Sequence, residues 1–290
     1  MRASPAPPSL PLRYLALCKP GLVLLAAAAA AAGYLLASPR LSAGLVVAAT
    51  GVLVLAAGAA ALNEYQERDL DARMDRTRRR PIPSGRIRPG LALGFSAILL
   101  AAGLAILSLG GSRPVVLGAL AAAWYNGVYT PLKKTSAMAA VPGALSGALA
   151  PAVGWTCAGG RLDDPRIAAL GLVLFIWQVP HFWLVVLGRA REFREAGLPN
   201  LLDVLSETQA RRVVSHWVLA TAAASLVIAG WSTFGLSLTR WGMVAISLWL
   251  AGRALMFRLS PGRMEASLFR TMNLHMLGLL LLISLDGILR

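Results

Sequence analysis

Long apolar runs separated by short polar segments occupy most of this chain. Runs of about 17–25 residues are long enough to cross a bilayer as helices. The predicted spans are Gly21–Ala37, Ala43–Leu62, Leu91–Leu109, Pro114–Tyr129, Ala137–Ala158, Ile167–Leu187, Val213–Phe234, Trp241–Met256 and Leu268–Leu289. Gly, Ala and Ser are abundant within them, and such small residues let neighbouring helices pack closely. The pattern therefore predicts an all-α integral membrane protein, built as a bundle of nine transmembrane helices.

Composition agrees with this reading and suggests the domain boundaries. The chain has 290 residues, of which 57% are hydrophobic and 14% charged, and a soluble domain of this size has a different balance. We expect the Pro-rich segment 1–12 to be a disordered cytoplasmic N-terminus and residues 13–290 to form a single nine-helix domain. Cys18 and Cys157 lie far apart in or beside apolar segments, so they indicate neither a disulfide framework nor a thiolate metal site.

The basic residues predict the orientation of the spans. Of the 28 Lys and Arg residues, 22 fall in the N-terminal segment and in the loops that alternate onto the same side of the bundle. The positive-inside rule makes that side cytoplasmic, with the N-terminus in the cytoplasm and the C-terminus outside. The same rule explains the net charge of +15. Because no basic soluble module is present, we expect a lipid bilayer around the protein and no nucleic-acid partner.

Four polar residues at four-residue intervals form the most informative motif of the chain. Asn63, Glu67, Asp71 and Asp75 would stack along one face of a helix. Such an acidic row is unfavourable unless a cation fills it, and an arginine cluster ending at Arg80 follows directly. Carboxylate oxygens suit Mg²⁺ and guanidinium groups suit phosphate, so the motif indicates a diphosphate site at a membrane surface. A charge-balanced, solvated loop is the simpler alternative.

Further motifs connect the chain with a known family. The acidic row, followed by Arg76-Thr77-xx-Arg80-Pro81, resembles the first acidic motif of the UbiA superfamily of intramembrane prenyltransferases. Within that superfamily, two segments are similar to signatures of the protohaem IX farnesyltransferase (haem O synthase) family. They read Tyr129-Thr130-Pro131-Leu132-Lys133-Lys134 and Trp177-Gln178-x-Pro180-His181-Phe182. Lys19-Pro20, before the first span, also fits. The resemblance covers the chain from about residue 13 to its end.

The sequence departs from the family pattern at several positions. Glu67 stands where the family commonly has Asp, Gly21 where an Arg is frequent, and Ala139 where Asn is usual. In the second acidic motif, Phe193 replaces Tyr and Leu202 replaces the last Pro. These changes gather in the region expected to bind diphosphate. They leave a second hypothesis, in which the same prenyl-transfer reaction uses another aromatic acceptor such as a quinone precursor.

The resemblance implies roles for the acidic residues. Prenyl transfer removes a diphosphate group from an allylic carbon, and Mg²⁺ neutralises that leaving group. We expect Glu67 and Asp71 to bind a first Mg²⁺ ion, with Asn63 as a neutral oxygen ligand or hydrogen-bond partner. Glu192 and Glu195, at i,i+3 spacing, would bind a second ion. Arginine and lysine side chains would contact the phosphates, and the candidates are Arg76, Arg80, Lys133 and Lys134.

The acceptor site is expected among aromatic and histidine side chains. Tyr129 and Trp177 are candidates for the cavity wall, since ring faces stabilise the carbocation. Interface anchoring is the alternative role for such residues. His181, His216 and His275 fall at a similar depth near the diphosphate side, and a buried imidazole can ligate haem iron. His181 and His275 are the preferred acceptor-binding candidates.

The implied reaction is Mg²⁺-dependent transfer of farnesyl from farnesyl diphosphate to a vinyl group of haem b, with water addition giving haem O. Haem b is then a substrate and Mg²⁺ a cofactor. The implied location is the bacterial cytoplasmic membrane, with haem A synthase or cytochrome oxidase assembly factors as candidate partners. A transporter or non-catalytic haem-handling protein is the remaining alternative. Transporters usually place charges at the midplane, whereas these charges gather at one face.

Overall fold

Helices form every regular element in the part of the chain that the structure, a computed structural model, describes: residues 9–231, 234–259 and 264–290. The elements in chain order are α1 (Leu10–Leu17), α2 (Pro20–Ala37), α3 (Ala43–Asp71), α4 (Pro89–Ser108), α5 (Ser112–Ala123), η1 (Trp124–Tyr129), α6 (Thr130–Leu132), α7 (Ala140–Gly143), α8 (Leu145–Ala148), α9 (Ala150–Cys157), α10 (Pro165–Leu187), α11 (Ala190–Glu195), η2 (Leu201–Asp203), α12 (Glu207–Ala229), α13 (Ser237–Leu259) and α14 (Glu265–Leu289). The predicted all-α class is confirmed.

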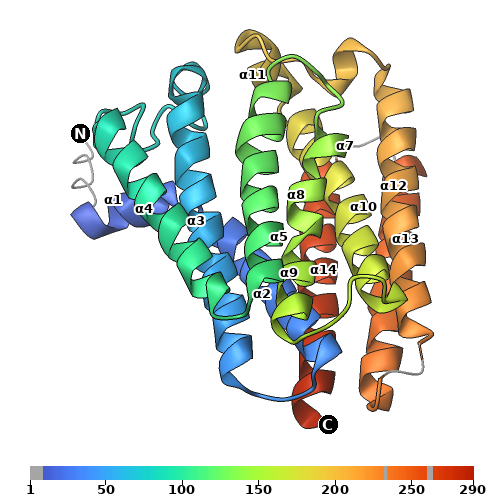
Figure 1. Ribbon diagram of the computed structural model, residues 1–290. Coiled ribbons are helices and arrows are strands. Elements are labelled where there is room, and N and C mark those ends of the chain that lie inside the picture. Colours follow the sequence, from blue (N-terminus) through green and yellow to red (C-terminus); the bar gives the residue numbers. More distant parts are fainter. Residues whose placement is uncertain (1–8, 232–233, 260–263) are drawn as a thin grey trace.

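Seven of the described helices are long and apolar enough to cross a membrane: α2, α3, α4, α10, α12, α13 and α14. The predicted count of nine is therefore not confirmed. The fourth predicted span is α5 continued through the π-helix η1 into α6, and the fifth is broken into α7, α8 and α9. Pro142 and Pro151 lie in this broken stretch, and a proline lacks the amide hydrogen that a continuous helix needs. Figure 1 shows the three short helices stacked beside α5.

Small residues permit close contacts between the backbones of neighbouring helices. A Cβ atom added at Gly33 of α2 would collide with the backbone of Pro151 in α9, and one added at Gly154 would collide with the backbone of Ala30. The two helices therefore touch along their backbones, as small residues allow in membrane proteins. This contact brings α9 against α2 in the centre of the fold.

The loops that carry the acidic motifs lie at one end of the bundle. In Figure 1 the α3–α4 connection and α11 are both at the top, and the C-terminus is at the bottom. Helix α3 continues nine residues past the predicted end at Leu62, so that it includes Asp71 but not Asp75. The expected disordered segment 1–12 falls mostly outside the described residues, and the structure places Leu10–Leu12 at the start of α1.

Candidate active site

A row of buried polar side chains lies on one face of α3, near the end of that helix. Asn63, Glu67 and Asp71 are 1%, 3% and 4% exposed, respectively. Their four-residue spacing places them one above another along the helix, in the arrangement that the sequence predicted. Carboxylates buried this deeply require partners, because an unpaired buried charge is strongly destabilising.

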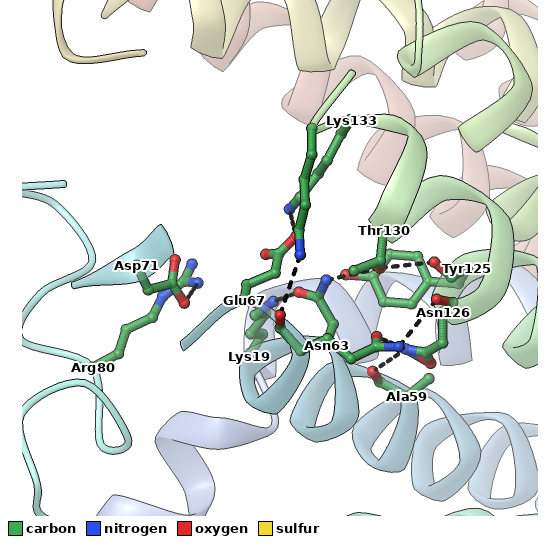
Figure 2. Close-up of polar contacts among 12 residues, drawn as sticks. Lys19, Ala59, Asn63, Glu67, Asp71, Arg80, Tyr125, Asn126, Thr130 and Lys133 are labelled. Atoms are coloured by element: carbon green, nitrogen blue, oxygen red, sulfur yellow. Dashed lines mark hydrogen bonds and ion pairs between the residues drawn. The ribbon is translucent and has the colours of Figure 1, made fainter. Parts of the chain in front are cut away.

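Basic side chains from other segments supply those partners. Lys133, just after α6, forms an ion pair with Glu67. Arg80 Nη1 lies 2.7 Å from Asp71 Oδ2. Figure 2 shows both contacts, with the two carboxylates approached from different segments of the chain. The structure therefore brings together two of the predicted metal ligands and two of the predicted phosphate-binding residues.

Lys19 is a further cation at this end of α3, and its role was not assigned from the sequence. Its Nζ donates a hydrogen bond to Asn63 Oδ1. Lys19 precedes Pro20 and has φ of 51°, a left-handed conformation that a non-glycine residue rarely adopts. Burial, followed by the nearby charges of Arg80 and Lys133, lowers its pKa to about 7. The Lys-Pro pair before the first span was the only signal of this position in the sequence.

Glu64 is a third buried carboxylate that the sequence reading overlooked. It is 1% exposed, and its Oε1 atom has no hydrogen-bond partner among the described residues. The charges of Arg80 and Lys19 both act on it. Glu64 lies three residues before Glu67 and seven before Asp71, spacings that also put all three on one helical face. Glu64 lies outside the series of four-residue intervals that starts at Asn63, so that series did not predict it.

A π-helix connects the acidic face of α3 to the interior of the bundle. Asn63 Nδ2 donates to Thr130 Oγ1 at 2.9 Å, and Thr130 in turn donates to the carbonyl of Tyr125 at 2.9 Å. Asn126 Nδ2 donates to the carbonyl of Ala59 at 3.0 Å (Figure 2). Tyr125, Asn126 and the end of η1 are thereby fixed to α3. Short π segments within longer helices are frequent at functional sites.

The second acidic motif reaches this end through one of its two glutamates. Glu192 Oε1 accepts a hydrogen bond from the backbone N–H of Arg76 at 2.9 Å. Glu195 instead pairs with Arg191 at 2.8 Å, and its side chain is 63% exposed. Met74 of the α3–α4 connection packs against Ala196 and Leu198 after α11, and this apolar contact holds the two motifs together.

The remaining predicted phosphate ligands are less enclosed. Desolvation and the neighbouring guanidinium groups of Arg80 and Arg189 lower the pKa of Arg76. Such crowding of cations favours the binding of an anion. Lys134 Nζ lies 3.4 Å from the carbonyl of Gln66. Arg189 follows the end of α10 without a recognisable motif, so the sequence does not predict it as a site residue.

An apolar cavity of about 630 Å³ extends from this end into the bundle. Ala59, one helical turn before Asn63, forms part of its wall, together with Tyr125 of η1. Trp177 and His181 of α10 lie on the wall as well, and their ring centroids are 4.7 Å apart. Along α3, the cavity wall therefore ends about one helical turn before the polar row begins at Asn63.

Aromatic rings connect the cavity to the charged end. Tyr129 stacks with Tyr125 at 5.7 Å and with Phe182 at 5.4 Å between ring centroids. Lys133 Nζ lies over the Tyr129 ring, 5.6 Å from its centroid. Gly143 provides the space for Tyr129, because a Cβ atom there would collide with the ring. The Tyr129 ring therefore lies between the charged Lys133 side chain and the aromatic residues of the cavity wall.

Comparison with known proteins decides the family. The sequence profile of the UbiA prenyltransferase family matches residues 22–277. The chain belongs to the UbiA prenyltransferase family. It is 42% identical over 260 residues to the protoheme IX farnesyltransferase of Geobacter sulfurreducens, with 89% of this chain and 93% of that protein covered. The predicted resemblance and enzyme class are confirmed.

Solved structures show the same fold at low sequence identity. A structure described as digeranylgeranylglyceryl phosphate synthase has a TM-score of 0.77 at 17% identity, covering 96% of this chain and 99% of that one. A UbiA homolog from Archaeoglobus fulgidus, bound to GPP and Mg²⁺, has a TM-score of 0.65 at 16% identity, covering 94% and 99%. With the seven apolar helices, the UbiA fold identifies an integral membrane protein.

The three histidines of this UbiA protein occupy different environments. His181 lines the cavity. His275 is completely buried but forms no part of that wall, and both of its ring nitrogens have no hydrogen-bond partner among the described residues. His216 is exposed beside Arg258. Their similar depth along the helices was visible in the sequence, whereas the direction in which each side chain points was not.

The donor atoms at the end of α3 fit the Mg²⁺ that the UbiA family implies. Glu67 and Asp71 provide carboxylate oxygens on successive turns, and the buried Oε1 of Glu64 has no hydrogen-bond partner within the described ranges. In these ranges, no three His, Cys, Asp or Glu side chains already surround a common point. Mg²⁺ needs only one or two carboxylates when waters and substrate phosphates complete its shell. The oxygen donors therefore suit this ion.

Proposed function

We propose that this UbiA protein transfers the farnesyl group of farnesyl diphosphate to a vinyl group of haem b, giving haem O. The observation that carries the proposal is the 42% identity, over 89% of the chain, to a protein named protoheme IX farnesyltransferase. An apolar cavity close to a charged, carboxylate-bearing end of α3 supports it, because an allylic diphosphate has one apolar and one anionic part.

The charged end of α3 would bind the diphosphate. Glu67 and Asp71 would hold Mg²⁺, with Asn63 as hydrogen-bond partner and Glu192 facing them from the second motif. Bound there, Mg²⁺ would neutralise the leaving diphosphate. Lys133 and Arg80 form ion pairs with the carboxylates, and they would move part of their bonding to phosphate oxygens. Arg76, Lys134 and the exposed Glu195 would act at the rim of this site.

The cavity would protect the allylic carbocation from water. Its apolar walls exclude solvent, and the stacked faces of Tyr125, Tyr129 and Phe182 would stabilise positive charge. The acceptor would lie against Trp177 and His181, with Tyr129 at the junction with the diphosphate. His275, which does not line the cavity, is not part of this proposal.

The sidedness of the charged loops supports a position in the bacterial cytoplasmic membrane, with the N-terminus and the diphosphate site facing the cytoplasm. Residues 13–290 would act as one domain. Haem A synthase and cytochrome oxidase assembly factors are the partners that the proposed product favours.

The test uses purified protein in detergent with haem b, farnesyl diphosphate and Mg²⁺, and mass spectrometry of the extracted haem. We expect a product heavier by one farnesyl group and one hydroxyl group, and no product after chelation of Mg²⁺. A parallel reaction replaces haem b with an aromatic quinone precursor, since Phe193 and Leu202 depart from the family pattern. Unchanged haem together with a prenylated quinone precursor would replace the proposed acceptor.

A further inference from the structure

Five polar side chains interrupt the apolar wall of the cavity: Tyr125, Ser146, Gln178, His181 and Asn273. A farnesyl chain makes no hydrogen bonds, so buried polar groups beside it carry a free-energy cost unless they serve another molecule. The proposed reaction needs such a molecule, because water must add to the carbocation that follows carbon–carbon bond formation. The polar side chains are therefore candidates for its binding site.

Gln178 is held so that one amide atom remains available to the cavity. Its Nε2 donates to the carbonyls of Ala144 at 3.2 Å and Leu174 at 3.3 Å. A Cβ atom at Gly147 would collide with the amide, so the glycine provides the space that this orientation requires. Within the residues that the structure describes, no protein donor reaches Oε1. Gln178 therefore presents a hydrogen-bond acceptor with fixed geometry.

His181 supplies a second acceptor three residues further along α10. Residues at i and i+3 lie on the same helical face, so the two side chains are neighbours. The imidazole packs against Trp177 and Phe269, with ring centroids 4.7 and 4.6 Å away. The side chain of Asn273 lies on the same cavity wall as this ring. The Nδ1 atom of this ring is buried and has no hydrogen-bond partner among the described residues, so it can accept a proton.

We infer that Gln178 and His181 bind and orient the water molecule that captures the final carbocation. The inference rests on the proposed function. The terminal vinyl carbon bonds to C1 of the farnesyl group while the C1–O bond breaks, and its electron pair leaves with diphosphate. Positive charge then remains on the vinyl carbon attached to the porphyrin. The water oxygen bonds to this carbon, one proton passes to His181, and the retained O–H donates to Gln178 Oε1.

The same carbocation has a second outcome when water is not held beside it. It loses a proton from the neighbouring carbon to His181, and the freed electron pair forms a carbon–carbon double bond. That product contains the farnesyl group but is lighter than haem O by one water. The ratio of the two products therefore reports on water capture separately from farnesyl transfer. In this arrangement His181 meets the acceptor at its reacting edge and not at the iron.

The experiment measures this ratio by mass spectrometry for the wild-type protein and for Gln178→Met, which replaces the amide with an apolar side chain of similar length. Gln209→Met, the same change at an exposed position outside the cavity, is the matched control. We expect the ratio of hydrated to dehydrated product to fall at least about tenfold in Gln178→Met, about 1.4 kcal/mol in relative barrier, and to stay unchanged in the control.

Two results would overturn the inference. Unchanged proportions in Gln178→Met would exclude a role in water capture. Complete loss of prenylated haem from a folded, haem-binding Gln178→Met protein would place Gln178 in the transfer step instead. Gln178→Leu repeats the measurement if the Met variant does not fold. Failure of the proposed function looks different, since the wild-type protein would then form no prenylated haem at all.

Discussion

The ion pair between Lys133 and Glu67 joins two segments that are 66 positions apart in the sequence. Lys133 follows a short helix at the end of the α5–η1–α6 rod, and Glu67 lies in the last turns of α3. The carboxylate is 3% exposed. Lys133 neutralises Glu67, a proposed metal ligand, when no substrate is bound. When the diphosphate binds, the Lys133 ammonium group can turn toward a phosphate oxygen and leave the Glu67 carboxylate to bind the metal.

Lys133 and the adjacent Lys134 offer a matched pair of variants. We expect Lys133→Met to lower kcat/KM for farnesyl diphosphate about 100-fold, because it removes a point charge from phosphate and leaves Glu67 buried without its partner. Lys134→Met should change kcat/KM by less than about threefold, since its contact is a long one at the surface. Steady-state kinetics of both variants checks this. Equal effects of the two substitutions would contradict the distinction.

Asp71→Asn tests the metal-binding proposal with little change in shape. The amide cannot provide the charge that Mg²⁺ and Arg80 both require, so turnover should fall at least about 100-fold. Haem binding, followed by its absorbance, should remain, because the cavity wall does not include Asp71. Asp75→Asn is the control, since Asp75 lies outside α3 and pairs at the surface with Arg78. Turnover by Asp71→Asn near the wild-type rate would remove this residue from the proposed site.

The acidic face of α3 was predictable because helical periodicity needs no tertiary information. The positions of Asn63, Glu67 and Asp71 follow from their spacing alone. The length of α3 was not predictable from hydropathy, since the apolar run ends at Leu62 although the helix continues. The partners of the three side chains were only partly predictable. Lys19 reaches the site through the unusual backbone before Pro20, and no periodic pattern signals such a turn.

The second motif shows a different limit of the sequence. Glu192 and Glu195 share the short helix α11, yet only Glu192 bonds to the α3–α4 connection. The difference depends on the tertiary contact of Met74 with Ala196 and Leu198, which fixes the rotation of α11. The predicted count of nine spans is not confirmed for a related reason. Hydropathy shows that residues 137–158 are apolar, but not that they form three short helices in place of one long helix.

The lowered pKa of Lys19 predicts a pH dependence of stability. The pKa is about 7 in the folded protein against an ordinary value of 10.5. Between these values the unfolded chain binds more protons, so the free energy of unfolding rises with pH from about 7 to 10.5 and is insensitive to this group below about 7. In Lys19→Met this contribution disappears. Thermal unfolding in detergent at several pH values should therefore show a smaller rise for Lys19→Met than for wild type or Lys134→Met.

Gly154 tests whether backbone contact between α2 and α9 shapes the fold. A larger side chain would press against the backbone of Ala30, which cannot rotate away as a flexible side chain could. We expect Gly154→Ala to destabilise the protein by about 1–3 kcal/mol and to lower its unfolding temperature in detergent. Gly94→Ala, in α4 where an added Cβ meets nothing within 4 Å, should be neutral or stabilising by up to about 1 kcal/mol. If Gly94→Ala destabilised the protein more than Gly154→Ala did, α2 and α9 would be able to move apart at little cost in free energy.

His181 and His275 differ in their relation to the cavity, and this difference predicts opposite results. His275 is completely buried outside the cavity wall, and its ring nitrogens lack partners among the described residues. His275→Leu therefore removes polar atoms that cost desolvation, so it should preserve haem affinity and leave stability unchanged or higher. His181→Leu should weaken haem binding and reduce turnover. Haem titration and thermal unfolding of both variants distinguish the two positions. Loss of haem affinity in His275→Leu alone would contradict this prediction and indicate that His275 binds the acceptor.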